Sequence, residues 1–164
     1  PRSTLFPYTT LFRSSITRTL AGAESLADIA TARALMHALS PFDVGQAVVV
    51  IDGHVIGIEG IEGTDGLLAR IAQLRAEGRV RAKPGRGVLV KAPKTKQDLR
   101  FDLPTFGPKT IEGVAAAGLA GIGIVAGHAL IADADRVVAT ADRQGLFVTG
   151  LPLWRDQHPR RRSF

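Results

Sequence analysis

Residues 47–58 read AVVVIDGHVIGI, and this stretch predicts a β-hairpin. Two apolar, β-branched runs, 47–51 and 54–58, are separated by Asp52-Gly53. That dipeptide favours the positive φ angles of a type I′ turn, which suits the twist of two adjacent strands. The hairpin is the strongest local signal in the chain, and the other elements are predicted outward from it.

Helices are predicted on both sides of the hairpin, at 25–39 and 65–77, where apolar residues recur at helical spacing. Ser25 and Thr64 are the expected N-caps, because each hydroxyl stands at the start of its run. A proline at 41 ends the first helix, and Gly78 ends the second.

Beyond residue 78, strands and helices continue to alternate. Asp133 is expected to cap the last helix and Gly145 to end it. Strands are predicted at 87–91, 120–125, 129–131 and 146–149, and helices at 108–117 and 134–144. This order predicts an α/β fold: a mixed sheet with the hairpin on its N-terminal side, flanked by helices.

The two ends of the chain do not continue the pattern. Residues 1–14 (PRSTLFPYTTLFRS) resemble translated sequencing-adapter DNA and are expected to be non-native or disordered, with 15–24 as a linker remnant. Residues 152–164 mix Pro, Arg, Trp and His and are expected to form a disordered basic tail. The predicted domain is therefore 25–151, part of a longer, truncated protein.

The charge is distributed unevenly along the 164 residues. The formal net charge is +6, but the two tails carry most of it, which argues against a nucleic-acid binder. Residues 70–100 hold ten Lys and Arg against Glu77 and Asp98, which predicts one local anion site. The chain has no cysteine, which excludes disulfides and thiolate metal sites. It has no apolar run long enough to span a membrane.

The densest polar cluster, residues 91–105 (KAPKTKQDLRFDLPT), begins where a predicted strand ends. In α/β domains, ligand-binding residues lie just outside the carboxyl ends of strands. Cations at this density suit a diphosphate, and carboxylates beside them suit Mg²⁺, which bridges phosphate oxygens. The alternative is a solvated loop in which Asp98 and Asp102 form ion pairs with neighbouring Lys and Arg side chains.

A second cluster, residues 59–66 (EGIEGTDG), places three acids at the start of the helix predicted at 65–77. Ordinary capping explains Asp65, because a helix N-terminus favours negative charge. A role as metal ligand or general base is the competing interpretation.

Three stretches together point to one family: 43–50 (DVGQAVVV), 59–65 (EGIEGTD) and 91–110 (KAPKTKQDLRFDLPTFGPKT). This combination resembles the C-terminal domain of the UDP-2,3-diacylglucosamine pyrophosphatase of the lipid A pathway, the type unrelated to calcineurin-like phosphoesterases. The resemblance covers residues 25–151. It implies Mg²⁺-dependent hydrolysis of the substrate's diphosphate, giving UMP and 2,3-diacylglucosamine 1-phosphate (lipid X). It also implies a two-domain enzyme with the lipid product between the domains, the N-terminal one being absent here.

The resemblance implies that Asp102 is the catalytic aspartate. As a hypothesis, Asp65 assists Asp102 in catalysis, and Asp98 joins Asp102 as a Mg²⁺ ligand. The expected substrate contacts are of two kinds: the cations Lys91, Lys94 and Arg100 stabilise developing charge, and the neutral side chains of Gln97, Gln46 and Thr64 contact sugar or phosphate.

The expected partners are the UDP-linked diacylated sugar and the missing N-terminal domain, with no nucleic acid. A cytoplasmic location, peripheral contact with the inner membrane and a homodimer are all compatible with the sequence. The rival function is a non-catalytic anion-binding module in which residues 70–100 hold RNA or an acidic lipid. An inert fragment is the third alternative, and Mg²⁺-dependent release of UMP distinguishes the first from both others.

Overall fold

The computed structural model describes residues 15–93, 105–125 and 129–152. The helices are α1 (Ala23–Leu39), a short 3-10 helix η2 (Ser40–Phe42), α2 (Gly63–Ala76), α3 (Pro108–Ala116) and α4 (Ala134–Gln144). The strands are β1 (Ala47–Ile51), β2 (His54–Ile58), β3 (Val88–Lys91), β4 (Thr105–Phe106), β5 (Gly121–Val125), β6 (Leu130–Ile131) and β7 (Phe147–Leu151). The predicted α/β class with a mixed sheet is confirmed.

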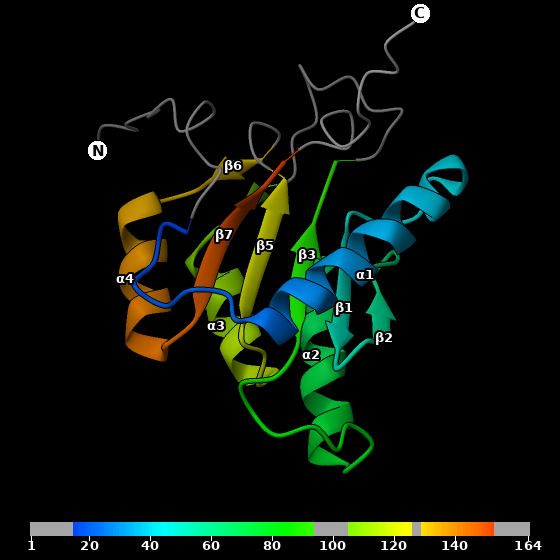
Figure 1. Cartoon of the computed structure of the whole chain (residues 1–164), viewed down its shortest axis with the longest axis horizontal. Coiled ribbons are helices and arrows are strands. Elements are labelled where there is room, and N and C mark those ends of the chain that lie inside the picture. Colours follow the sequence, from blue (N-terminus) through cyan, green and yellow to red (C-terminus); the bar gives the residue numbers. More distant parts are fainter. Residues whose placement is uncertain (1–14, 94–104, 126–128, 153–164) are drawn as a thin grey trace, which may run out of the picture.

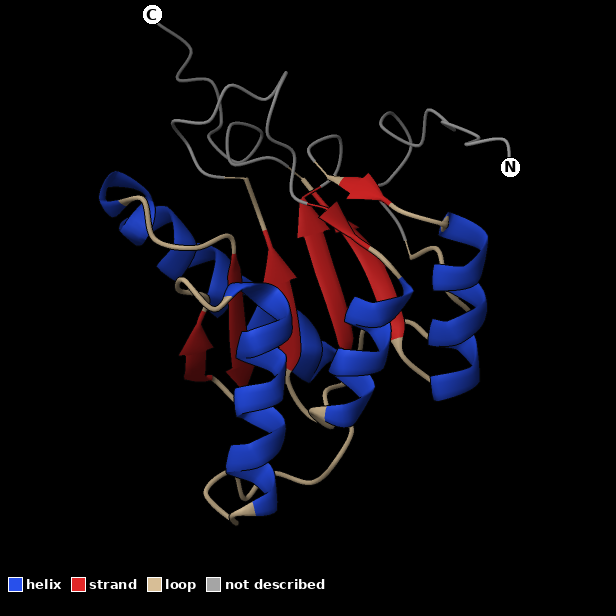
Figure 2. Cartoon of the chain, turned by 180° about the vertical axis from the view of Figure 1, so that it is seen from behind, coloured by secondary structure: helices blue, strands red, loops and turns tan. Residues whose placement is uncertain are grey.

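Five strands form the main sheet in the order β2-β1-β3-β5-β7. Strands β3, β5 and β7 are parallel to one another, whereas β1 is antiparallel to both of its neighbours. Helix α1 covers one face of the sheet (Figure 1), and α2, α3 and α4 cover the other (Figure 2). The result is a three-layer α/β/α arrangement in which β2, β3, β5 and β7 all end at the same edge.

The hairpin forms as predicted. Asp52 and Gly53 have φ angles of 50° and 78°, which fits the turn type that the dipeptide favours. The buried carboxylate of Asp28 on α1 accepts hydrogen bonds from both turn amides, at 3.1 and 2.6 Å. Helix α1 is therefore tied to the hairpin by polar contacts as well as by packing.

The core divides into two clusters because successive strand residues point to opposite faces. On β1, Val48 and Val50 pack towards α1, whereas Val49 packs with α2 and α3. Leu89 of β3 continues the second face, and Leu67 of α2 covers it. All of these side chains are buried. Because both faces are covered, the strands read as continuous apolar runs rather than alternating ones.

Two of the expected N-caps are wrong. Helix α1 begins earlier than predicted, with Gly22 at its N-cap, and α2 has Glu62 at its N-cap; neither has a side-chain cap. The Thr64 hydroxyl donates instead to Glu59, a contact outside the helix. The third cap is confirmed, since the Asp133 side chain accepts from the Arg136 amide and Gly145 closes α4 in a left-handed conformation.

The chain termini of the predicted domain also differ from expectation. Strand β7 extends to Leu151, two residues beyond the predicted end. Ser15 bridges Thr149, and the Ile16 amide donates to the Val148 carbonyl at 3.0 Å. The stretch 15–24, expected to be a linker remnant, thus begins as an extra pairing on the outer edge of β7.

A second, two-stranded parallel sheet joins β4 to β6, with Thr105 opposite Leu130 and Phe106 opposite Ile131. The sequence predicted β6 but assigned the residues of β4 to a loop or left them without structure. Among the described helices, none has the length and apolar character needed to cross a bilayer.

Gly121 provides a stability test. A Cβ atom there would overlap the backbone carbonyl of Phe147, because β5 and β7 approach closely at their first paired residues. Gly121→Ala is therefore expected to lower the free energy of unfolding by about 1–3 kcal/mol, the usual cost of overpacking. Urea denaturation followed by circular dichroism measures the change.

The matched control is Gly22→Ser. No heavy atom lies within 4 Å of the new Cβ, and the serine hydroxyl supplies the side-chain cap that α1 lacks. This variant is expected to be neutral or more stable by a few tenths of a kcal/mol, roughly the difference between Gly and Ser as N-caps. Equal effects of the two substitutions would contradict the close approach at Gly121.

Candidate active site

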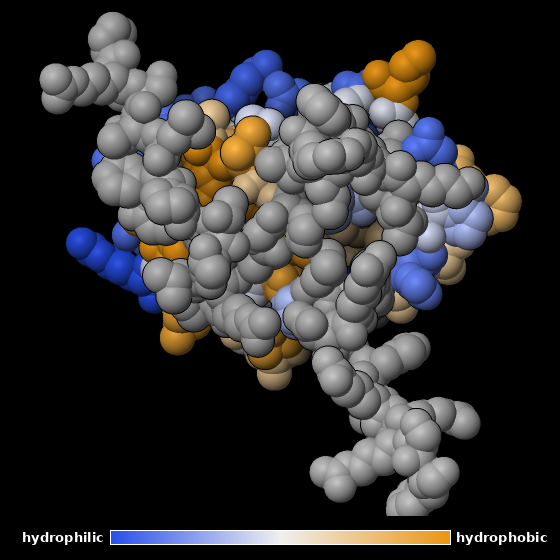
Figure 3. Space-filling view, turned by 90° about the horizontal axis from the view of Figure 1, so that it is seen from above, coloured by the Kyte–Doolittle hydropathy of each residue, from blue (hydrophilic) through white to orange (hydrophobic). Residues whose placement is uncertain are grey.

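The candidate site lies at the carboxyl edge of the sheet, where the described chain brings separate segments together. Lys91 is the last residue of β3, Glu59 follows β2, and Gln46 precedes the antiparallel strand β1. Helix α2 starts at this edge and carries Thr64 and Asp65 in its first turn. The arrowheads of β2, β3, β5 and β7 in Figure 1 all point towards it. Seen from above, hydrophobic and hydrophilic side chains lie next to each other on this face (Figure 3).

A chain of hydrogen bonds crosses this edge. The Thr64 hydroxyl donates to Glu59 Oε2 at 2.7 Å and accepts from Lys91 Nζ at 2.8 Å. The same ammonium donates to the Thr105 carbonyl at 3.2 Å. Four segments of the chain therefore meet around one charged nitrogen.

Lys91 carries a buried charge. The residue is only 5% exposed, since it extends the face on which Leu89 packs against α2 and α3. Burial lowers the pKa of Lys91 below its ordinary value, and the negative charges of Glu59 and Asp65 oppose that shift. A cation held in place by acceptors, with little competing water, is suited to stabilising negative charge on a bound group.

Asp65 lies in a more exposed environment than Lys91. Its side chain is half exposed and forms an ion pair with Lys109 of α3, with Nζ 2.7 Å from Oδ2. The hydrogen bond and charge of Asp65 raise the pKa of Lys109 above its ordinary value. One carboxylate oxygen of Asp65, the residue expected to assist Asp102, is thus already paired with Lys109 of the neighbouring helix.

Gln46 is fixed by its backbone. Its carbonyl accepts from the Ala92 amide at 3.0 Å, immediately after Lys91, and the Ala47 carbonyl next to it accepts from the Glu59 amide at 2.8 Å. Gly45 packs so closely against the Glu59 backbone that a Cβ atom would overlap it. These contacts bring the ends of β2 and β3 together on either side of β1.

The described residues unite Gln46, Thr64, Asp65 and Lys91 of the predicted site at one edge of the sheet. The other predicted residues lie outside the described ranges: Lys94, Gln97, Asp98, Arg100 and Asp102. Within residues 15–93, 105–125 and 129–152, no group of three side chains of the kind that hold a metal ion lies together.

The prediction of one anion site along 70–100 is wrong for its first half. Helix α2 runs away from the carboxyl edge, so the residues between α2 and β3 lie at the opposite edge (Figure 1). Arg75 donates to the carbonyls of Ala82 and Ala117, and Arg70 pairs with Glu62. The described contacts of these arginines hold parts of the fold together, and none of these contacts is with Lys91.

Arg86 is also engaged within the fold. It pairs with Glu24 of α1 and with Asp52 of the hairpin turn. The positive charge just before β3 therefore fastens α1 to the turn instead of lying open to a ligand.

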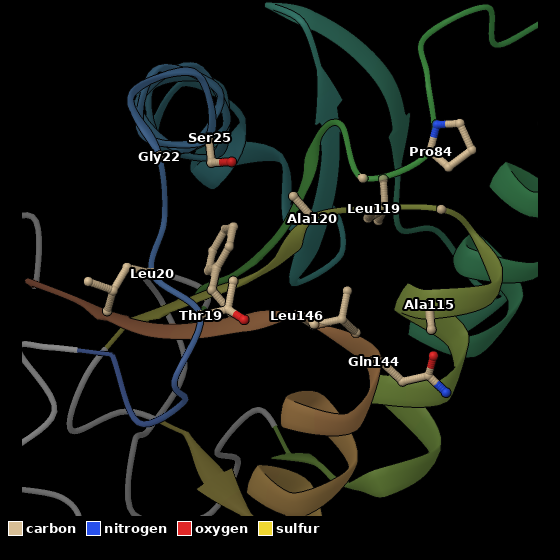
Figure 4. Close-up of a pocket in the computed structure, with 14 residues that line it drawn as sticks. Thr19, Leu20, Gly22, Ser25, Pro84, Ala115, Leu119, Ala120, Gln144 and Leu146 are labelled. Atoms are coloured by element: carbon tan, nitrogen blue, oxygen red, sulfur yellow. The ribbon is translucent and has the colours of Figure 1, made fainter.

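A pocket of about 430 Å³ lies at the opposite edge, near the start of α1. Thr19, Leu20 and Leu146 line it, and Pro84 and Gln144 lie at its sides (Figure 4). It is next to the amino ends of β5 and β7, away from Lys91. Ligand sites of α/β domains lie at the other edge, and this pocket contains none of the predicted site residues.

Sequence reasoning missed two residues and gave a third no specific role. The sequence pattern gives no role to Lys109, which pairs with Asp65, or to Arg33 of α1, which donates to the Pro152 carbonyl at 2.7 Å. Glu59 is distinguished in the sequence only as one of three clustered acids. The five-residue spacing between Glu59 and Thr64, across a strand end and a helix start, was the available signal for that pair.

The fold defines an α/β domain whose candidate site lies at the carboxyl ends of its strands, where α/β domains usually bind their ligands. The family model described as LpxI C-terminal domain matches residues 13–149. The chain belongs to the LpxI C-terminal domain family.

A curated relative from Caulobacter vibrioides is named UDP-2,3-diacylglucosamine pyrophosphatase LpxI. It is 44% identical over 142 residues, which cover 87% of this chain and 51% of the relative. The chain thus spans about half the length of the relative that it matches.

The ion pair on α3 predicts a measurable pKa change. Replacing Asp65 by Asn removes the charge that raises the pKa of Lys109, so this pKa is expected to fall towards its ordinary value. Because the folded-state pKa is the raised one, the pair's stabilisation is complete below the unfolded pKa and is lost as pH rises through the folded one. Lysine side-chain NMR titration follows the change.

Asp135→Asn on α4 is the control, since Asp135 does not contribute to the Lys109 shift. The same Lys109 pKa in all three proteins would contradict the ion pair.

Proposed function

We propose that this domain is the catalytic half of an enzyme that hydrolyses the diphosphate of UDP-2,3-diacylglucosamine in lipid A biosynthesis. The products are UMP and 2,3-diacylglucosamine 1-phosphate. Family membership and the name of the Caulobacter relative support the substrate. The observation in this chain that carries the proposal is the buried Lys91 ammonium at the carboxyl edge, a group suited to a diphosphate.

The reaction adds water across one phosphorus–oxygen bond. The water oxygen bonds to phosphorus, the bond to the bridging oxygen breaks, and the two water protons go to phosphate oxygens or to solvent. Negative charge grows on the departing phosphate, and Lys91, Lys94 and Arg100 are proposed to stabilise it. Gln46 and Gln97 are proposed as neutral contacts to sugar or phosphate.

Asp102 is proposed as the catalytic aspartate and lies outside the described residues. Chain length limits its distance from the described edge. It precedes Thr105 by three residues, a span of about 11 Å at most in an extended chain. The Thr105 carbonyl accepts from Lys91 Nζ, so the chain re-enters the described residues beside the ammonium. Asp65 is the proposed second carboxylate.

Mg²⁺ is proposed as the cofactor, held by Asp98 and Asp102. Carboxylate oxygens are the ligands that this ion prefers, and bound Mg²⁺ neutralises phosphate charge. One oxygen of each nearby described carboxylate is already engaged, since Glu59 Oε2 accepts from Thr64 and Asp65 Oδ2 pairs with Lys109. Asp98 and Asp102 are therefore the proposed Mg²⁺ ligands.

A companion N-terminal domain is proposed to supply the rest of the substrate cleft, since the matched relative extends well beyond this chain. A cytoplasmic location with peripheral contact to the inner membrane would give access to a lipid-linked substrate. A homodimer belongs to the same proposal. Arg70, Arg75 and Arg86 are engaged within the fold, which counts against the rival anion-binding module.

The test is UMP release with and without Mg²⁺. The protein should join residues 15–164 to the portion of the Caulobacter relative that the match leaves uncovered. Asp102→Ala in this protein is expected to lower kcat at least about 100-fold, the usual scale for losing a group that moves or orients a proton. Substrate binding should persist.

The 164-residue chain alone, assayed in parallel, shows what the companion domain contributes. Asp133→Asn, which alters a helix cap far along the chain, is the control and should retain turnover. Near-normal turnover in Asp102→Ala would remove Asp102 from the mechanism. Absence of UMP release from the joined, folded protein would overturn the proposed function.

A further inference from the structure

We propose that Glu59 is a positioning residue of this site, which acts through the Thr64 hydroxyl to hold the Lys91 ammonium at the carboxyl edge of the sheet. The proposal deepens the proposed function and rests on it for the activity measurements. It also changes the role of Thr64 from a substrate contact to part of the support for Lys91.

The hydrogen-bonding capacity of Thr64 leads to this reassignment. A threonine hydroxyl has one proton to donate, and here that proton goes to Glu59 Oε2 at 2.7 Å. One of its lone pairs accepts from Lys91 Nζ at 2.8 Å. Phosphate oxygens at neutral pH need donors, so Thr64 binds a phosphate only by giving up Glu59.

The carboxylate of Glu59 sets the direction of this hydroxyl. A negatively charged acceptor makes a stronger bond than a neutral one, so the proton stays on the Glu59 side. The oxygen lone pairs then face Lys91. Glu59 thereby stabilises the ammonium twice, through the oriented hydroxyl and through its own charge across it.

Lys91 requires such support because it is buried. An ammonium without acceptors in an apolar surrounding is strongly unfavourable. Within the described residues its acceptors are the Thr64 hydroxyl and the Thr105 carbonyl. Removing the hydroxyl leaves one of these two, so the side chain is expected to turn towards solvent.

The backbone of Glu59 is held independently of its side chain. Its amide donates to the Ala47 carbonyl, and Gly45 packs directly against its carbonyl group. A substitution of the Glu59 side chain therefore changes the hydrogen-bond chain while the strand end keeps its place. This separation makes the role of the carboxylate testable.

The first experiment measures Lys91 directly in the 164-residue chain and needs no activity. Acetylation by an amine-reactive ester, quantified by peptide mass spectrometry, reports the access of each lysine together with the fraction of its amine that is unprotonated. In the unaltered chain Lys91 should react much more slowly than the exposed Lys109. Thr64→Val should raise the Lys91 rate at least about fivefold, whereas Thr64→Ser, which keeps the hydroxyl, should not.

Glu59→Gln should also raise the Lys91 rate, since its amide is a weaker acceptor of the same shape. Glu62→Gln is the matched control: Glu62 lies three residues away, pairs with Arg70 and makes no contact with Thr64 among the described contacts. An unchanged Lys91 rate in both Thr64→Val and Glu59→Gln would overturn the proposal.

The second experiment is a double-mutant cycle in the joined two-domain protein. Thr64→Val and Glu59→Gln should each lower kcat/KM by about tenfold, and each should have little further effect once Lys91→Met is present. A merely structural role predicts additive losses together with a lower melting temperature, and that result would overturn the proposal. Faster labelling of Lys91 without UMP release from any protein would reject the proposed function and leave the Lys91 support intact.

Discussion

A buried ammonium is the interaction on which this edge of the molecule depends. Strand β3 is apolar until its last residue, and Lys91 then places a charge at the edge where α2 begins. That charge needs acceptors, and no single local segment provides them. They come from the start of α2 and from the backbone at β4, with Glu59 behind them at the end of β2. The charge is tolerated because the sheet brings these segments together.

The sheet order explains why these segments meet. Strand β1 runs opposite to its neighbours, so its beginning lies beside the ends of β2 and β3. Gln46, Glu59 and Lys91 are far apart in the sequence, yet they lie at one edge for this reason. The opposite edge receives the chain between α2 and β3, and there Arg75 donates to the backbone carbonyls of Ala82 and Ala117. Positive charge is thereby divided between a structural edge and a candidate site.

Much of this fold could be predicted, because its strongest signals are local. Asp52-Gly53 requires a turn that few other residues adopt, and Asp133 caps α4 through an amide only three residues away. Prediction failed where a distant partner competed with the local rule. Thr64 satisfies the pattern of a helix cap, but Glu59 accepts its proton instead. The basic run at 70–100 suggested one patch, because sequence spacing does not show that α2 carries the chain away to the opposite edge of the sheet.

For the site, the sequence identified Gln46, Thr64, Asp65 and Lys91 as a group but not the contacts among them. Asp65 pairs with Lys109 rather than with a substrate or metal. The sequence could not show this ion pair, because it depends on how α3 packs against α2. Likewise, the role of Glu59 depends on a strand end and a helix start facing each other.

The pairing of Ser15 and Ile16 with β7 has a consequence for self-association. Strand β7 is the last of the sheet, and an open outer strand is a template for another chain. The amide of Val148 is bonded to the Thr17 hydroxyl and its carbonyl to the Ile16 amide. Ser15, Ile16 and Thr17 therefore occupy hydrogen-bonding positions on the outer edge of β7 that another chain could otherwise use.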